Sequence, residues 1–279
     1  MTQSTQHKVD SKQDLINYVV RLGDDAIVLG HRISEWVSEG PFLEEDIALG
    51  NVALDYIGRA RMFYGYAATL SGNGKTEDDF AFLRDEREFE NYLINELPRG
   101  DFAYTITRQL LVDLYNKYYL QALTRSADPT LVAIAQKAVK ETTYHCRRSK
   151  SWALRLGDGT DESKQRMQLA IDDIWGYSHE LFESDELEQR LINTGVAVDC
   201  AALKQPWLAD VEAIFEEAGL TTPEQTWAVR GGRKGYHSEH LGHLLTQMQF
   251  VYRSFPGAKW LSYDRSNSLV NPDEVEPSI

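Results

Sequence analysis

The chain has 279 residues, of which 42% are hydrophobic and 26% are charged, and this composition is ordinary for a soluble globular protein. Its formal net charge of -14 argues against a general binder of nucleic acids or anionic membranes, because either function requires a dominant positive surface. Two cysteines cannot build a disulfide framework, the polar N-terminus is unlike a signal peptide, and no long apolar run suggests a membrane span, so a cytoplasmic protein is expected.

The first part of the chain predicts a helical hairpin. Residues 1–11 are expected to form a disordered lead-in, after which Ser11 or Asp14 can cap a helix. Between Arg21 and Tyr64 the helical periodicity is interrupted only at Gly40-Pro41, since proline disfavours a helical residue before it. Two long helices that fold back on each other are therefore predicted, and the second ends near residue 70.

Further helices follow in the rest of the chain. A lesser helix is expected over 80–95, and Asp101 can cap a third long helix that reaches Leu123. Asp128-Pro129 can begin a fourth, and shorter helices are expected over 167–182, within 203–229 and from 237 to Pro256. No alternating stretch demands a sheet. We therefore expect an all-α fold, a bundle of four long helices with additional accessory helices, as a single domain over 12–261 with an irregular tail over 262–279.

Polar residues occur at positions where these helices should face one another. In the second helix the series expected to face inward is Ile47, Asn51, Asp55, Gly58 and Met62, and Glu35 of the first helix is expected to face Asp55. Carboxylate-bridged di-iron bundles take one Glu from each of two helices and a Glu-x-x-His pair from each of the other two. The corresponding six positions in this chain are Glu35, Asp55, Gly58, Asp113, Thr142 and His145. Gly58 leaves an imidazole position empty, and Thr142 places a hydroxyl where a carboxylate belongs.

The pattern predicts a degenerate metal site. Lys117 lies one turn beyond Asp113, and it could supply the positive charge that metal ions would otherwise provide to an internal network of ion pairs and hydrogen bonds. Two alternatives stay open. The polar residues could form an unrelated network, or the chain could be an autonomous di-iron oxygenase or oxidase with the ligands Glu35, Asp55, Asp113 and His145.

Longer motifs resemble a known family, the C subunit of bacterial phenylacetyl-CoA 1,2-epoxidase, also called ring 1,2-epoxidase. The motifs span about residues 15 to 255, and such composite matches are more specific than a lone Glu-x-x-His. They are Arg21-Leu-Gly-Asp-Asp25, Leu29-Gly-His-Arg32, Ser34-Glu-Trp36, Gly40-Pro41, Leu43-Glu-Glu-Asp-Ile-Ala-Leu49, Ala53-Leu-Asp55, Lys140-Glu141, Tyr144-His145, Arg155-Leu-Gly-Asp-Gly-Thr-Asp-Glu-Ser163 and His237-Ser-Glu-His-Leu-Gly242.

The resemblance implies a ferritin-like, structural subunit of the phenylacetate-degrading epoxidase that holds no metal and no other cofactor. It implies a homologous catalytic A subunit as partner, which carries the di-iron centre and epoxidises the aromatic ring of phenylacetyl-CoA. The implied complex also has a small B subunit and a reductase with flavin and iron-sulfur groups. A homodimeric scaffold with no enzyme partner is the alternative from a different class.

Three other features are candidate sites. His237, His240 and His243 fan over one helix, and two of them could bind a metal, although surface or capping roles are the ordinary alternative. The basic glycine-rich turn at 230–235 could contact the phosphates of CoA or a partner subunit, or could simply be an exposed loop. Tyrosines crowd the third long helix, and this favours a stable subunit interface.

Overall fold

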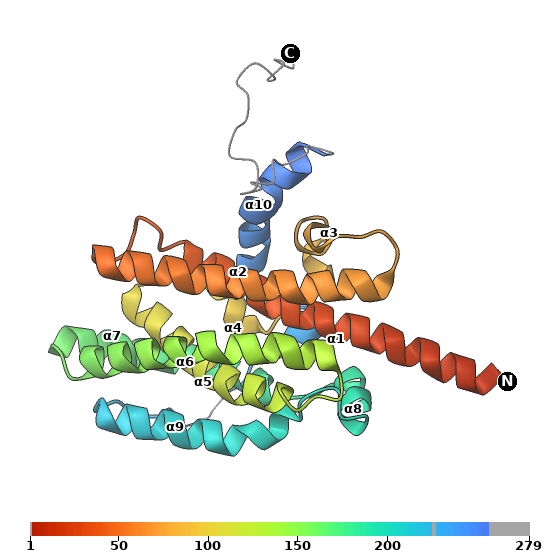
Figure 1. Ribbon diagram of the computed structural model, residues 1–279. Coiled ribbons are helices and arrows are strands. Elements are labelled where there is room, and N and C mark those ends of the chain that lie inside the picture. Colours follow the sequence, from red (N-terminus) through yellow and green to blue (C-terminus); the bar gives the residue numbers. More distant parts are fainter. Residues whose placement is uncertain (1, 225–226, 257–279) are drawn as a thin grey trace, which may run out of the picture.

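The computed structural model describes residues 2–224 and 227–256, with side chains from residue 12 onward. Four long helices dominate it: α1 (Thr2–Ser34), α2 (Leu43–Ser71), α5 (Phe102–Leu123) and α6 (Pro129–Gly157). Helix α1 packs along α2, and α5 packs along α6, so that two antiparallel hairpins lie against each other (Figure 1). No strand occurs in the described part of the chain, which confirms the predicted all-α class.

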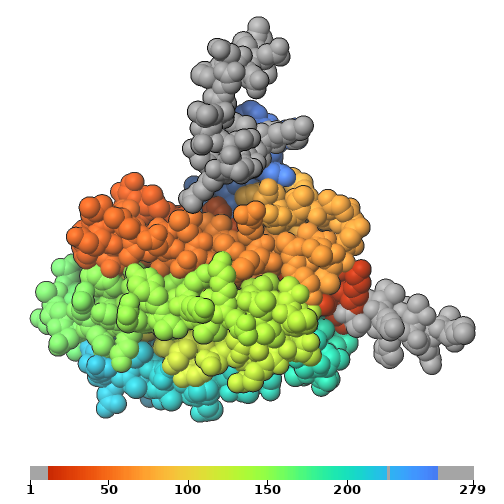
Figure 2. Space-filling view, viewed as in Figure 1, coloured from red at the N-terminus to blue at the C-terminus, as the bar shows by residue number. Residues whose placement is uncertain are grey.

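Shorter elements surround the two hairpins. They are α3 (Glu77–Phe82), η1 (Glu86–Glu88), α4 (Leu93–Glu96), α7 (Asp161–Ile174), η2 (Trp175–Phe182), α8 (Glu186–Asn193), η3 (Cys200–Leu203), α9 (Lys204–Glu217), η4 (Gly232–Lys234) and α10 (Glu239–Ser254), where η denotes a 3-10 helix. Helices α7 and α9 pack on α5 and α6, and α10 crosses α1 and α3. The space-filling view shows α2 and α6 side by side on one face, with α9 along the lower edge (Figure 2).

Helix starts follow the capping residues of the sequence. The Asp101 side chain accepts a hydrogen bond from the Tyr104 amide, and Asp128 accepts two, from Thr130 and Leu131. Pro129 is the first residue of α6, where a missing amide proton costs nothing. These caps satisfy amides that a helix leaves unpaired, and they confirm the predicted beginnings of both helices.

The region 80–95 differs from the predicted lesser helix. It consists of three short turns of helix joined by extended residues, because its backbone bonds to α1 instead of to itself. The Glu90 amide donates to Asp24 Oδ2 at 2.9 Å, and the Tyr92 amide donates to Asp25 Oδ1 at 2.7 Å. Two carboxylates of α1 therefore compete with local helix formation here.

The N-terminal end of the described chain differs from the expected structure, whereas the end of α10 agrees with it. Helix α1 extends back through residues 2–11, where the sequence predicts a disordered lead-in. The tail predicted over 262–279 lies outside the described residues. Helix α10 ends at Ser254, two residues before Pro256, as the proline predicts.

The buried face of α2 differs from the face that the sequence pattern predicts. Ile47 and Asn51, expected to point inward, are exposed, and Asp55 is only half-buried. The residues that face the bundle interior lie on nearly the opposite side of the helix, roughly 150° around it at 100° per residue, and they are Leu49, Val52, Ala53, Tyr56, Arg59, Ala60, Phe63, Tyr64 and Ala67. An arginine therefore stands within an otherwise apolar and aromatic buried face.

Candidate functional site

Helices α2, α5 and α6 bring several predicted site residues together. His145 Nε2 lies 2.9 Å from Asp55 Oδ2, and the Tyr56 hydroxyl donates to Asp113 Oδ1 at 2.9 Å. One turn further along α2, Arg59 Nη2 donates to Thr142 Oγ1 at 3.0 Å. We call these residues the α2–α6 polar cluster, and its members are Asp55, Tyr56, Arg59, Asp113, Thr142 and His145.

Burial raises the pKa values of two members of this cluster. Asp113 is 2% exposed, and burial raises the pKa of its carboxyl although His145, Ser149 and Tyr56 all favour the charged form. Burial also raises the pKa of the Tyr56 hydroxyl well above its ordinary value, and the charge of Asp113 adds to this effect. Tyr56 therefore acts as a neutral hydrogen-bond donor to the carboxylate and is not an acid or base near neutral pH.

Arg59 is the cation of the cluster. Its side chain is 3% exposed, and its guanidinium lies over the Tyr56 ring, 4.7 Å from the centroid. The nearest carboxylate oxygen is Glu141 Oε2, at 3.9 Å from Arg59 Nη2. Burial raises the pKa of Glu141, with the charge of Arg59 opposing that shift. A buried guanidinium without a close carboxylate is expensive, so its remaining donors need other partners.

Glu35 does not join the cluster. It lies in the turn just after α1, where its carboxylate accepts a hydrogen bond from Arg32 Nη1 at 2.6 Å. Its backbone carbonyl accepts another from Arg99 Nη1 at 3.0 Å. The expectation that Glu35 faces Asp55 across the hairpin therefore differs from the structure, because α1 ends one residue before Glu35 and Arg32 holds the carboxylate.

Lys117 is also placed differently from the expectation. Its ammonium lies 2.7 Å from Asp210 Oδ2 of α9, and 46% of its side chain is exposed. The Tyr118 hydroxyl donates to the same carboxylate oxygen at 2.7 Å. Lys117 thus ties α5 to α9 at the surface, and the positive charge inside the α2–α6 polar cluster belongs to Arg59.

The residues of the cluster do not fit a pair of metal ions. Gly58 contributes no ligand, Thr142 already accepts a hydrogen bond from Arg59, and a guanidinium beside the site repels divalent cations. Within residues 12–224 and 227–256, no three His, Cys, Asp or Glu side chains are close enough together to hold a metal ion. The chain's own groups form a hydrogen-bonded cluster in which only Asp55 and His145 meet as a carboxylate and an imidazole.

Tyr56 and Arg59 are the members of the cluster that sequence reasoning missed. A signal for them was present, because Leu49, Val52, Tyr56 and Phe63 recur at helical spacing, and Arg59 interrupts this otherwise hydrophobic series. A metal-ligand template contains only carboxylates and imidazoles, and it therefore does not point to a buried arginine.

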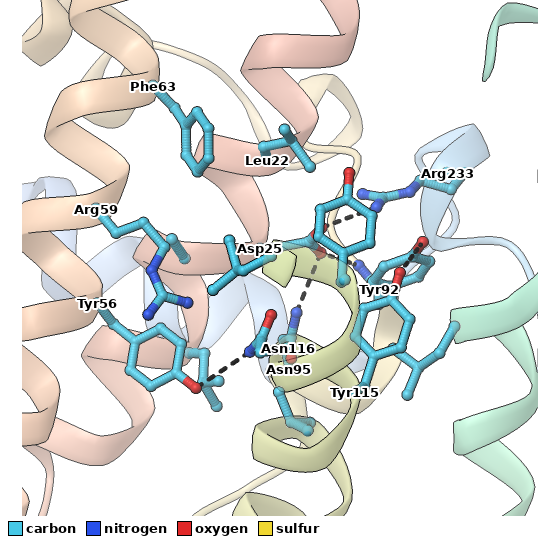
Figure 3. A pocket seen from close by; sticks show the side chains of 16 residues that line it. Leu22, Asp25, Tyr56, Arg59, Phe63, Tyr92, Asn95, Tyr115, Asn116 and Arg233 are labelled. Atoms are coloured by element: carbon cyan, nitrogen blue, oxygen red, sulfur yellow. Dashed lines mark hydrogen bonds and ion pairs between the residues drawn. The ribbon is translucent and has the colours of Figure 1, made fainter. Parts of the chain in front are cut away.

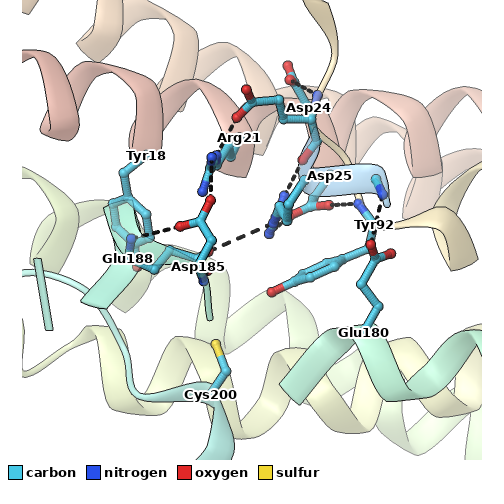
Figure 4. A network of polar contacts seen from close by, with 12 residues as sticks. Tyr18, Arg21, Asp24, Asp25, Tyr92, Glu180, Asp185, Glu188 and Cys200 are labelled. Carbon is cyan, nitrogen blue, oxygen red and sulfur yellow. Dashed lines mark hydrogen bonds and ion pairs between the residues drawn. The ribbon is translucent and has the colours of Figure 1, made fainter. Parts of the chain in front are cut away.

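The basic glycine-rich turn is filled by the protein's own carboxylate. Glu180 Oε1 accepts hydrogen bonds from the amides of Gly231 and Gly232, each at 2.8 Å. Arg233 is 9% exposed and donates to Asp25 Oδ2 at 2.8 Å, within an interior network that also includes Asp185 (Figure 4). The Gly231 and Gly232 amides and the Arg233 guanidinium are therefore engaged inside the fold, whereas Arg230 pairs with Glu183 at the surface and Lys234 is exposed.

The three histidines near the C-terminus have separate roles. His237 Nδ1 lies 2.8 Å from Glu96 Oε2, and its Nε2 lies 2.8 Å from the Phe89 carbonyl. The backbone carbonyl of His240 accepts a hydrogen bond from Arg32, and His243 is exposed. The contacts of His237 are those of a residue that fastens the chain before α10 onto the bundle.

Fold and site together define a class of protein: a ferritin-like helical bundle in which arginine, tyrosine and threonine stand among the residues of a di-metal template. A family model described as "Phenylacetic acid catabolic protein" matches residues 1–260, and the chain belongs to this family. The chain is 47% identical over 246 residues to a protein of Escherichia coli (strain K12) that is named as the C subunit of 1,2-phenylacetyl-CoA epoxidase. That alignment covers 88% of this chain and 99% of the relative. In the described part of the chain, no helix combines the length and the apolar character needed to cross a membrane.

Proposed function

We propose that this chain is a structural, non-catalytic subunit of a phenylacetyl-CoA 1,2-epoxidase. Its work is to dock and stabilise a homologous A subunit that carries the di-iron centre, within a complex that also contains a B subunit and a reductase. The likeness to a protein named as the C subunit of this enzyme supports the assignment to the complex. The observation that carries the non-catalytic role is the buried Arg59 guanidinium in the α2–α6 polar cluster.

Arg59 argues against oxygen chemistry in this chain for an electrostatic reason. A di-iron site needs several carboxylates to balance the charge of two multivalent cations, whereas Arg59 adds a further cation in a medium of low dielectric constant. Only the contact of Asp55 with His145 resembles a ligand pair. The autonomous oxygenase with Glu35, Asp55, Asp113 and His145 as ligands would also need Glu35 to leave Arg32.

The outer face of α2 supports a docking role. We define this α2 outer face by Leu43, Ile47, Gly50, Leu54, Gly58 and Gly65, which lie on one side of the helix at its 3.6-residue repeat. Leu43, Ile47 and Leu54 are 70%, 56% and 65% exposed. A Cβ atom added at Gly58 or Gly65 would meet no described heavy atom within 4 Å, so another helix could approach closely there. Large apolar side chains beside glycines are typical of a surface that packs on a partner helix.

The test is reconstitution from purified subunits. This chain is mixed with the A subunit of the same source, and complex formation, iron content and ring oxidation of phenylacetyl-CoA with B subunit and reductase are measured. We expect no iron and no turnover from this chain alone, and a gain in stability or turnover of the A subunit when the chain is added. Close to two irons per chain with turnover alone would overturn the proposal, and so would a chain that forms only homodimers beside an unaffected A subunit.

A further inference from the structure

A small internal cavity lies beside Arg59 between the two hairpins. Its volume is about 40 Å³, measured as the space open to water-sized spheres. Side chains of α1, α2, the segment around α4, and α5 line it together with Leu181 and Arg233, and most of these side chains are buried. In the close view, Arg59, Asn95 and Asn116 converge on this space from different elements (Figure 3).

Three buried polar atoms of the lining residues lack a hydrogen-bond partner among the described residues. One of them, Arg233 Nε, lies 3.8 Å from Glu188 Oε1, and the other two are Arg59 Nε and Asn95 Oδ1. Arg59 Nε is a hydrogen-bond donor, and Asn95 Oδ1 is a hydrogen-bond acceptor. Both side chains are 3% exposed, so bulk water does not satisfy them. The other end of the Asn95 amide is engaged, since Nδ2 donates to Asp25 Oδ1 at 3.1 Å, and this fixes which Asn95 atom is the acceptor.

The chemistry of these two atoms selects the occupant of the cavity. An anion could accept from Arg59 but could not donate to Asn95, and a metal cation could bind the Asn95 oxygen but would be repelled by Arg59. Water can do both. One ordered water molecule needs a volume of roughly 10–15 Å³ and two to four polar partners. The cavity therefore has room for about three water molecules.

We propose that ordered water molecules fill this cavity and hydrogen-bond Arg59 of α2 to Asn95 of the α4 segment. The water and the guanidinium together link the two elements in the interior of the bundle. The inference concerns only this chain's interior and holds whether or not the proposed docking is correct.

The test is a high-resolution crystal structure of the unmodified chain, with further crystals soaked in bromide and in manganese(II). We expect density for water within hydrogen-bonding distance of Arg59 Nε and of Asn95 Oδ1, and no anomalous signal in the cavity from either soak. An empty cavity overturns the proposal. An anomalous peak for bromide or manganese beside Arg59 overturns it as well, because an ion would then be the occupant.

A double-mutant cycle tests the same link in solution. If water connects the two side chains, the effects of Arg59→Met and Asn95→Leu should be non-additive, so that the double variant raises the unfolding equilibrium constant by about fivefold less than the product of the two single increases. Gln109→Leu is the matched control, because Gln109 is a buried amide with unpaired atoms that does not line this cavity. If the effects of Arg59→Met and Asn95→Leu are additive, as is expected for Arg59→Met combined with Gln109→Leu, the link is contradicted.

Discussion

His145 Nε2 lies 2.9 Å from Asp55 Oδ2, and this contact joins α6 of one hairpin to α2 of the other. The two partners differ in burial, because the imidazole is fully covered whereas 36% of the Asp55 side chain is exposed. The imidazole also stacks on the Tyr56 ring, with centroids 5.3 Å apart. The histidine therefore contributes packing as well as a polar contact.

This difference predicts unequal effects of removing the two partners. We expect His145→Ala to lower the free energy of unfolding by about 2–4 kcal/mol, since it opens a cavity beside Tyr56. Asp55→Ala should cost only about 0–1 kcal/mol, because water reaches its carboxylate and can replace it. Urea unfolding of both variants measures the two values, and equal losses would contradict the importance of packing.

The ion pair of Asp24 with Arg84 predicts a large loss of stability. Asp24 is fully buried and also accepts hydrogen bonds from the Tyr64 hydroxyl at 2.6 Å and the Glu90 amide. Asp24→Ala should cost about 3–5 kcal/mol, because it leaves the Arg84 guanidinium buried without its carboxylate. Arg61→Ala is the control, since Arg61 is 77% exposed in its pair with Glu77 and its loss should cost at most about 1 kcal/mol. Similar midpoints of thermal unfolding for the two variants would refute this ranking.

His237 predicts a dependence of stability on pH. Burial by itself lowers the pKa of this imidazole, but its hydrogen bond to Glu96 and the charge of that carboxylate outweigh burial and raise the pKa above its ordinary value of 6.5. Since the native pKa is raised, the stabilisation is complete below about pH 6.5 and is lost as the pH rises through the native value.

His237→Gln should therefore flatten the stability profile above pH 6.5, whereas His243→Gln should leave it unchanged because His243 is exposed. Chemical unfolding followed across this range provides the comparison. A profile that keeps its slope in His237→Gln would assign the pH dependence to other groups.

Two substitutions of Gly58 test the isolated chain and the complex separately. A Cβ atom at this mid-helix position has open space, so Gly58→Ala should raise the free energy of unfolding by about 0.5–1 kcal/mol. Gly58→Leu should fold equally well but should weaken binding of the A subunit, because the larger side chain would separate the two helices. Calorimetric unfolding and a binding titration give the two results, and undiminished binding of Gly58→Leu would place the interface elsewhere.

Leu54 tests the α2 outer face directly. It is 65% exposed, so Leu54→Glu should leave the stability of the isolated chain almost unchanged. Binding of the A subunit should become at least about tenfold weaker, since a charge would be buried in an apolar contact. Leu169→Glu on α7 is the control, because Leu169 is 60% exposed on another helix. Equal binding by both variants would count against the α2 outer face.

The helices, their starts and the hairpin break could be predicted because local signals specify them. Asp101, Asp128 and Pro129 act on amides within one turn, and Gly40-Pro41 interrupts helical periodicity wherever it occurs. The segment 80–95 could not be predicted, since carboxylates of Asp24 and Asp25, more than sixty residues away, capture its backbone. A pattern of side chains does not reveal such a long-range competitor.

The site was predicted in part. Sequence spacing correctly grouped Asp55, Thr142 and His145, because residues three apart lie on one face of a helix. It assigned the internal positive charge to Lys117, whereas the structure places Lys117 on Asp210 and Arg59 inside. Lys117 stays at the surface because α9 packs against α5 and brings Asp210 to it, whereas Arg59 is inside because it lies on the buried face of α2.

By itself, the sequence determined the all-α class and the two hairpins, because these follow from helical periodicity and short-range spacing. Tertiary structure alone decided that Glu35 pairs with Arg32, that Glu180 fills the glycine-rich turn, and that Arg59 borders a polar cavity. These outcomes depend on which elements pack against each other, since burial and the nearest opposite charge are properties of the assembled core.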